Sequence, residues 1–199
     1  MNDGKNTHIA YSGVFAGAAT ALSYNRTYAA GASEKEKPII AIGQMCSTND
    51  IESNIGLCRR LCIEAKEQGA CFLSLPECFE YMGIPGTGDA LAAAQPLEGG
   101  PAAASSEDVS GSLFSRYQRL AKEHGLWLSL GGFHERTSPD DPKMYNTHAI
   151  VDAEGSLVAA YRKLHLFDVD YDGGFRESAS THKGGEALLV TDTPIGKRS

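Results

Sequence analysis

Between residues 39 and 130, three short apolar runs alternate with two amphipathic segments. The runs are Ile39–Gln44, Cys71–Leu75 and Leu126–Leu130, and each has the length and composition of a buried β-strand. The segments between them repeat apolar residues with the period of a helix that packs through one face. Strands that alternate with helices in this way predict an α/β domain built in layers.

The two amphipathic segments also carry signals for where each helix begins and ends. In the first, Asn49 or Asp50 can accept hydrogen bonds from the first turn, and Gly69 supplies the stop. Glu52 stands three residues after Asn49, which is the spacing of a capping box. Gly125 ends the second helix in the same way. The apolar face of that second helix is expected at Leu113, Phe114, Tyr117, Leu120 and Ala121.

Two further regions complete the predicted layout. The stretch from Gly83 to Gly111 is rich in Gly, Pro, Ala and Ser and has no sustained period, so we expect a long surface loop there. Farther along, Tyr145–Val151 and Leu157–Tyr161 flank the polar connection Asp152–Gly155, a pattern typical of a β-hairpin. The domain is therefore expected to continue β-α-β-α-β with a hairpin.

Charged residues follow two of the predicted strands. Pro76 ends one strand and places Glu77 at its carboxyl end, and the hairpin places Lys163 at the end of its second strand. Because open α/β layers project functional groups from strand ends, both residues are candidates for a catalytic site. The simpler alternatives are that Glu77 is a helix cap or a solvated loop charge and that Lys163 is a surface lysine.

Composition limits the classes of function. The chain has 199 residues, of which 42% are hydrophobic, enough for the core of one domain. Its formal net charge is -7 and no basic block offsets this, which argues against partners such as nucleic acid or an anionic membrane surface. No apolar stretch approaches the roughly 20 residues that a membrane-spanning helix needs. The composition fits a protein that acts on small molecules better than one that binds nucleic acid or membranes.

The five cysteines are an odd number and stand mostly within apolar runs, which favours reduced thiols over a disulfide framework. Cys58 and Cys62 share one helical face, where they could be metal ligands together with a histidine or, as we expect, core thiols. Cys78 adjoins Glu77, but neighbours on an extended segment point to opposite sides. We therefore do not expect Cys78 to be a nucleophile for a substrate held by Glu77.

The first 37 residues differ in composition from the rest. Residues 1–33 are rich in small and hydroxyl side chains and contain Asp3 as their only acid. We expect residues 1–37 to be an N-terminal extension, either disordered or an organellar transit peptide. A secretory signal built around Gly13–Leu22 is a third alternative. The predicted location is cytoplasmic, or organellar (plastid or mitochondrion) if the extension is a transit peptide.

Several ordered motifs between about Lys37 and Lys197 together resemble the nitrilase, or carbon-nitrogen hydrolase, superfamily. The motifs are Leu75–Glu77 with Phe79 behind it, Gly131–Glu135, Tyr145–Asn146, Tyr161–Asp170 and Arg176–Ser178. The run His165–Asp170 is most similar to the branch of omega-amidases and deaminated glutathione amidases. The resemblance implies an α-β-β-α sandwich, with residues 38–199 as a partial carbon-nitrogen hydrolase domain that is incomplete at its C-terminus.

The resemblance also implies roles for three residues. Glu77 would be the general base and Lys163 the oxyanion donor, while Glu177 would orient the lysine and the attacking water or, alternatively, form a plain salt bridge. The family's nucleophile is a cysteine that follows the lysine by several tens of residues, and the last cysteine here is Cys78. No metal or organic cofactor is implied.

Three alternatives for function stay open. The chain is an amidase for amides of short carboxylic acids, such as deaminated glutathione or α-keto ω-amides, truncated before its cysteine and inactive in this form. It is a non-catalytic subunit that pairs with intact copies, since the family commonly forms oligomers. Or it is an unstable splice product.

Overall fold

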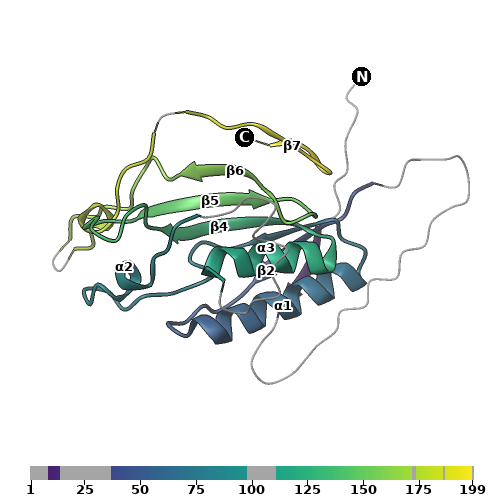
Figure 1. The fold of residues 1–199 in the computed structure, drawn as a ribbon, viewed down its shortest axis with the longest axis horizontal. Coiled ribbons are helices and arrows are strands. Elements are labelled where there is room, and N and C mark those ends of the chain that lie inside the picture. The colour runs from purple at the N-terminus through teal and green to yellow at the C-terminus, as the bar shows by residue number, and fades with distance from the viewer. Residues whose placement is uncertain (1–8, 14–36, 98–110, 172–173, 186, 199) are drawn as a thin grey trace, which may run out of the picture.

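The computed structural model describes residues 9–13, 37–97, 111–171, 174–185 and 187–198. Within these residues one sheet of six strands runs in the order β1-β2-β3-β4-β5-β6 (Figure 1). Pairs from β1 to β4 are parallel, and β4, β5 and β6 are antiparallel. The strands are β1 (Ile9–Gly13), β2 (Ile40–Gln44), β3 (Phe72–Leu75), β4 (Trp127–Glu135), β5 (Tyr145–Val151) and β6 (Leu157–Arg162).

Helices α1 (Ile51–Glu67) and α3 (Leu113–His124) contact each other and lie on the same face of the sheet (Figure 1). Gly69 and Gly125 both have positive φ, at 76° and 56°, so the predicted stops are confirmed. These helices and the six-stranded sheet are one helical layer and one sheet of the expected α-β-β-α sandwich. The fold class predicted from the sequence is therefore confirmed.

The start of α1 differs in one respect from the prediction. Asp50 caps the helix, because its Oδ1 accepts a hydrogen bond of 3.1 Å from the Ser53 backbone N–H. The expected capping box at Glu52 was wrong. Both oxygens of the Glu52 carboxylate instead accept hydrogen bonds from Arg116 on α3, at 2.6 and 2.7 Å, because the helix partner offers a two-pronged guanidinium.

The cap supports a stability prediction. Asp50→Ala should lower the free energy of unfolding by about 1 kcal/mol, because it leaves a first-turn N–H without its acceptor. Urea denaturation would measure this loss. Ser53→Ala is the matched control, since it keeps the backbone N–H that donates to Asp50. Equal losses in the two variants would contradict the assignment of the cap.

Two segments contain structure that the sequence analysis did not predict. The expected loop between Gly83 and Gly111 contains a short helix, α2 (Asp89–Ala93), and residues 98–110 of that prediction lie outside the described residues. Within the expected N-terminal extension, β1 pairs with β2 as an edge strand. The remaining residues of the extension before Lys37 lie outside the described residues.

The core lies between the two long helices and the sheet. The aromatic rings of Phe79 and Tyr117 meet edge to face at 4.8 Å between centroids, and Phe114 meets Phe133 in the same way at 5.6 Å. The predicted core thiols are confirmed: both are fully buried on α1, and burial raises the pKa of Cys62 to about 12 and that of Cys58 further. All five cysteines are free.

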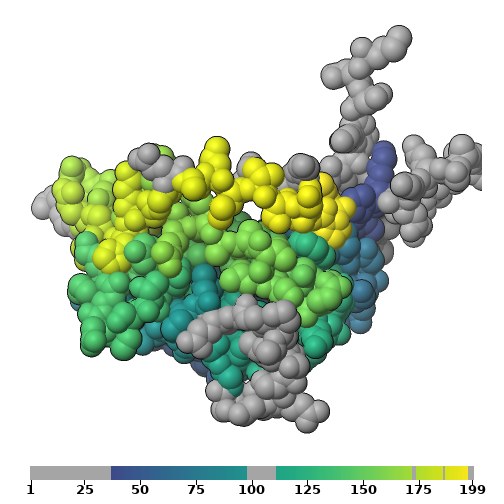
Figure 2. All heavy atoms as spheres, turned by 45° about the horizontal axis from the view of Figure 1, so that its top comes forward, coloured from purple at the N-terminus to yellow at the C-terminus, as the bar shows by residue number. Residues whose placement is uncertain are grey.

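The C-terminal segment forms a separate two-stranded sheet of β7 (Thr191–Thr193) and β8 (Gly196–Arg198). Figure 2 shows this segment in yellow along one margin of the face that the green strands form. Just before β7, Leu188 is 84% exposed and Val190 is 61% exposed. The chain therefore presents apolar side chains to solvent here.

Candidate active site

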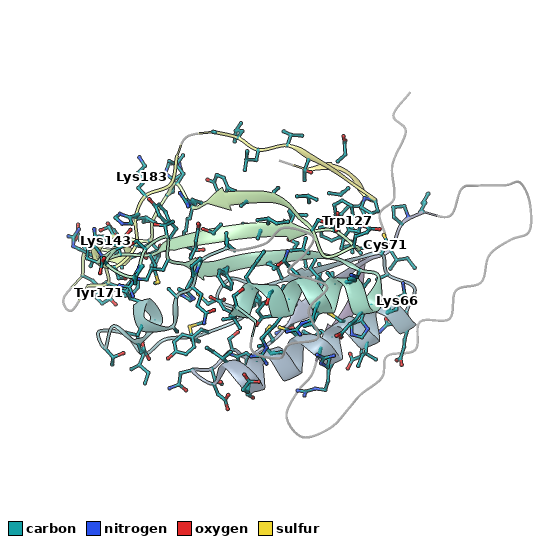
Figure 3. The ribbon with its side chains drawn as sticks, in the orientation of Figure 1. Lys66, Cys71, Trp127, Lys143, Tyr171 and Lys183 are labelled. Carbon is teal, nitrogen blue, oxygen red and sulfur yellow. The ribbon has the colours of Figure 1, made fainter. Side chains whose placement is uncertain are left out.

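The predicted site residues meet at one end of the six-stranded sheet. Glu77 follows β3, Lys163 follows β6, and Glu177 begins the short 3-10 helix η2 (Glu177–Ala179). This is the left end in Figure 1, where β4 and β6 end and β5 begins. Figure 3 labels Lys143, Tyr171 and Lys183 at this end and labels Cys71 and Trp127 at the opposite end.

Lys163 lies between the two glutamates. Its Nζ is 3.0 Å from Glu77 Oε1 and 3.0 Å from Glu177 Oε2. Asn146, near the start of β5, donates from the same Nδ2 to Glu77 Oε1 at 2.5 Å and to Glu177 Oε1 at 3.3 Å. Two carboxylates thus share one ammonium and one amide. The structure brings all three predicted site residues together and adds Asn146 to them.

The electrostatics of this group favour the charged states of Glu77 and Lys163. Burial alone would raise the pKa of Glu77, but hydrogen bonds from Lys163 and Asn146 outweigh it and lower the pKa below its usual value. Burial alone would lower the pKa of Lys163, and the hydrogen bonds to Glu177 and Glu77 outweigh it and raise the pKa. The arrangement therefore holds an ammonium beside an ionised carboxylate that can accept a proton.

The two carboxylates differ in how firmly they are held. The Glu177 side chain is 12% exposed, and its Oε2 also accepts a hydrogen bond of 2.6 Å from the Phe167 backbone N–H. The Glu77 side chain is 54% exposed. Glu177 is therefore the fixed member of the pair, whereas Glu77 is open on one side to a reacting molecule.

Two glycines allow Glu77 to reach this position. The pairing of β4 with β5 shifts register between Leu130 and Phe133, which places Gly131 and Gly132 against the end of β3. A Cβ on Gly132 would lie 2.8 Å from Asn146 Oδ1 and 3.0 Å from Glu77 Cγ. The close packing of the site on β4 therefore depends on the absence of side chains at these positions.

An ion pair between Arg162 and the buried carboxylate of Glu135 braces the strand that delivers Lys163. Arg162 donates to both oxygens of Glu135 on β4, at 2.6 and 2.9 Å, and Thr147 adds a third hydrogen bond of 2.6 Å. The guanidinium carbon of Arg162 also lies 4.0 Å from the centroid of the Tyr145 ring. These contacts fix the end of β6 next to the start of β5, one residue before Lys163.

The described residues contain neither a metal-binding cluster nor a membrane-spanning helix. Within the described ranges, no three His, Cys, Asp or Glu side chains are grouped so as to hold a metal ion. In that same part of the chain, no helix has the length and apolar character needed to cross a membrane.

Comparison with known proteins extends these observations. Residues 39–199 match the carbon-nitrogen hydrolase family. The chain belongs to this family. A Bos taurus protein named deaminated glutathione amidase is 43% identical over 176 residues, which are 86% of this chain and 50% of that protein. The Homo sapiens protein of the same name is 39% identical over 176 residues, which are again 86% of this chain and 50% of that protein.

A solved structure shows the same fold. The crystal structure of the C. elegans NitFhit protein matches with a TM-score of 0.65 and 34% identity, over 79% of this chain and 36% of that one. The chain spans about half the length of the curated mammalian relatives it matches. The nitrilase superfamily assignment predicted from the motifs is therefore confirmed.

The geometry supports a pH prediction for Glu77. Because its pKa is lowered in the folded state, Glu77 contributes stability above the ordinary glutamate pKa of about 4.3, and this is lost as the pH falls through the folded value. A carboxyl-carbon NMR titration should place the midpoint of Glu77 below about 4.3. Lys163→Ala should move that midpoint upward, and Lys183→Ala should not. An unmoved midpoint in Lys163→Ala would contradict the ion pair.

Proposed function

We propose that this chain supplies the acid-base and oxyanion-binding residues of an amidase that acts on amides of short carboxylic acids, such as deaminated glutathione or α-keto ω-amides. One observation carries the proposal, namely the contact of Lys163 with both Glu77 and Glu177 at the ends of the strands. The names of the mammalian relatives support this substrate class. The substrate is expected to be a small molecule.

The chemistry assigns one role to each residue. Glu77 takes the proton of a cysteine thiol, the thiolate attacks the amide carbon, and Lys163 stabilises the oxyanion of the tetrahedral intermediate. Glu77 then gives the proton to the amide nitrogen, the C–N bond breaks, and ammonia leaves. Water, activated by Glu77, then cleaves the thioester, while Glu177 keeps the lysine in place. The exposed carboxylate of Glu77 suits proton transfer, and the fixed carboxylate of Glu177 suits positioning.

The nucleophile in this scheme is the cysteine that the family resemblance implies. Among the cysteines of this sequence, Cys78 stands beside Glu77, but its sulfur contacts His134 while the Glu77 carboxylate contacts Lys163 and Asn146. We therefore propose that the 199-residue chain does not hydrolyse amides by itself. The predicted location in the cytoplasm or an organelle stays a prediction.

A non-catalytic role is the second candidate. The exposed apolar side chains before β7, from Leu188 to Val190, favour a chain that associates with another subunit. Under this proposal the chain pairs with an intact member of the same family and contributes contacts rather than turnover.

An assay of ammonia release from deaminated glutathione would test the proposed function. The 199-residue chain should give no measurable rate, whereas a chimera that continues into the C-terminal half of the bovine relative should be active. Hydrolysis by the 199-residue chain that is abolished by cysteine alkylation would contradict the assignment of the nucleophile. A folded but inactive chimera would contradict the amidase assignment and favour the non-catalytic subunit.

A further inference from the structure

A second group of titratable side chains lies beside the amidase site and takes no part in the proposed reaction. Glu80, which follows β3 closely, accepts a hydrogen bond of 2.7 Å from the His134 backbone N–H, and the same oxygen lies 2.6 Å from the Nδ1 of the His134 ring. The other ring nitrogen, Nε2, lies 3.8 Å from the Cys78 sulfur. The three side chains form a line of carboxylate, imidazole and thiol.

The buried carboxylate of Glu80 influences the protonation of the His134 ring. Glu80 is only 1% exposed, and among the described residues its Oε2 has no hydrogen-bond partner. A buried carboxylate is costly without a cation beside it, and the His134 ring is the group in contact with Oε1. Burial alone would lower the pKa of His134, but its hydrogen bonds to Cys78 and Glu80 raise that pKa to about 10. The buried carboxylate therefore favours the protonated form of the ring.

The imidazolium faces the sulfur of a residue that is held rigidly. Cys78 has a positive φ of 54°, which is uncommon for a residue with a side chain, and its backbone N–H donates to Gly132 O at 3.0 Å. A protonated ring at this distance stabilises the negative charge that develops on the sulfur as it reacts. The residue is half-buried, in contrast to the fully buried Cys58 and Cys62.

We propose that Cys78 is a reactive cysteine that forms mixed disulfides with small disulfide molecules. The Cys78 sulfur attacks one sulfur of the small disulfide, a new S–S bond forms to Cys78, and the old S–S bond breaks. The displaced half leaves as a thiolate and takes up one proton from solvent. The cysteine sulfur is oxidised and the small disulfide is reduced, so no further reactant is needed. The added group would lie one residue from Glu77.

The other cysteines provide internal references. Cys58 and Cys62 are fully buried, and burial raises their pKa values, so both should react slowly in the folded chain. Burial also raises the pKa of Cys71. Cys46 is exposed and gives the rate of an accessible thiol in the same sample.

Timed reaction of the 199-residue chain with dithiobis(nitrobenzoate), followed by peptide mass spectrometry, measures the rate at each cysteine. Cys78 should react on the order of tenfold faster than Cys46. Two variants remove the charge on the ring with little change of shape: His134→Gln, and Glu80→Gln, which takes away the carboxylate that holds the proton. Each should slow Cys78 by on the order of tenfold and leave Cys46 unchanged.

Each outcome of these experiments either supports or overturns the proposal. A wild-type chain in which Cys78 reacts no faster than Cys46 overturns the proposal, whatever the variants do. So does a variant that retains the fast rate at Cys78 while Cys58 and Cys62 stay protected, since that protection shows that the variant is folded. Nitrogen NMR of the wild-type His134 ring is a check that needs no variant: a protonated ring at neutral pH supports the proposal, and a neutral ring overturns it. None of these measurements depends on amide hydrolysis.

Discussion

In the chimera that continues into the C-terminal half of the bovine relative, the proposed function predicts that Glu77→Gln lowers kcat/KM for amide hydrolysis by on the order of 10²-fold or more. The amide keeps the size of the side chain but cannot accept the proton of the thiol or of water. Lys163→Ala should cause a loss of the same order, because it removes the donor to the oxyanion. Steady-state ammonia release would measure both.

Two matched controls make this result specific. Glu154→Gln changes an exposed glutamate in the connection between β5 and β6, and Lys183→Ala removes an exposed lysine at the same end of the sheet as the site. Both should keep near-normal rates. If Glu77→Gln or Lys163→Ala also kept near-normal rates, the assignment of the site would be wrong.

Lys163→Ala should have a second effect that Glu77→Gln lacks. Without the ammonium, Glu77 and Glu177 remain two carboxylates that share only the amide of Asn146. Like charges so arranged favour protonation of one of them. The pH dependence of the residual activity should therefore differ between the two variants, which separates loss of the base from loss of the cation.

The alternating elements were predictable because their signals are local. Apolar runs and helical periods placed the strands and both long helices within a few residues of their observed bounds, and Gly69 and Gly125 gave the stops. The extension of β4 as far as Glu135 and the capping role expected of Glu52 were not predicted correctly. Both depend on partners far along the chain, namely β5 and Arg116, which no local pattern encodes.

Some residues of the candidate site were likewise predictable from local sequence, and others were not. Glu77 and Lys163 followed from their positions at strand ends, whereas Glu177 depended on the family motif, because it stands in a loop without a regular period. Asn146 was part of a motif but had no predicted role, and its place near the start of a strand was the available signal. The line from Glu80 to Cys78 joins two residues that are two positions apart to His134, which is 54 positions from Glu80 and 56 from Cys78, so only the fold reveals it.

The largest effect on stability is expected at the glycine pair beneath the site. Gly131→Ala should lower the free energy of unfolding by roughly 1–3 kcal/mol or more. The new Cβ would lie 2.4 Å from Leu75 O and 2.9 Å from the carbonyl carbon and oxygen of Pro76, which is closer than atoms can approach. All three are backbone atoms, so relief requires a shift of the segment that carries Glu77. Urea denaturation measures the stability, and the NMR titration of Glu77 reports on the site.

Gly185→Ala is the control for the same chemical change. A Cβ at Gly185 meets nothing within 4 Å, and Gly185 is not among the glycines with positive φ. Since alanine restricts the unfolded chain more than glycine does, this variant should be neutral or more stable by up to about 1 kcal/mol. The Glu77 midpoint should rise in Gly131→Ala, as its contact with Lys163 is weakened, and should stay unchanged in Gly185→Ala. Equal stability of the two variants would show that β4 does not hold the end of β3 in the way these distances require.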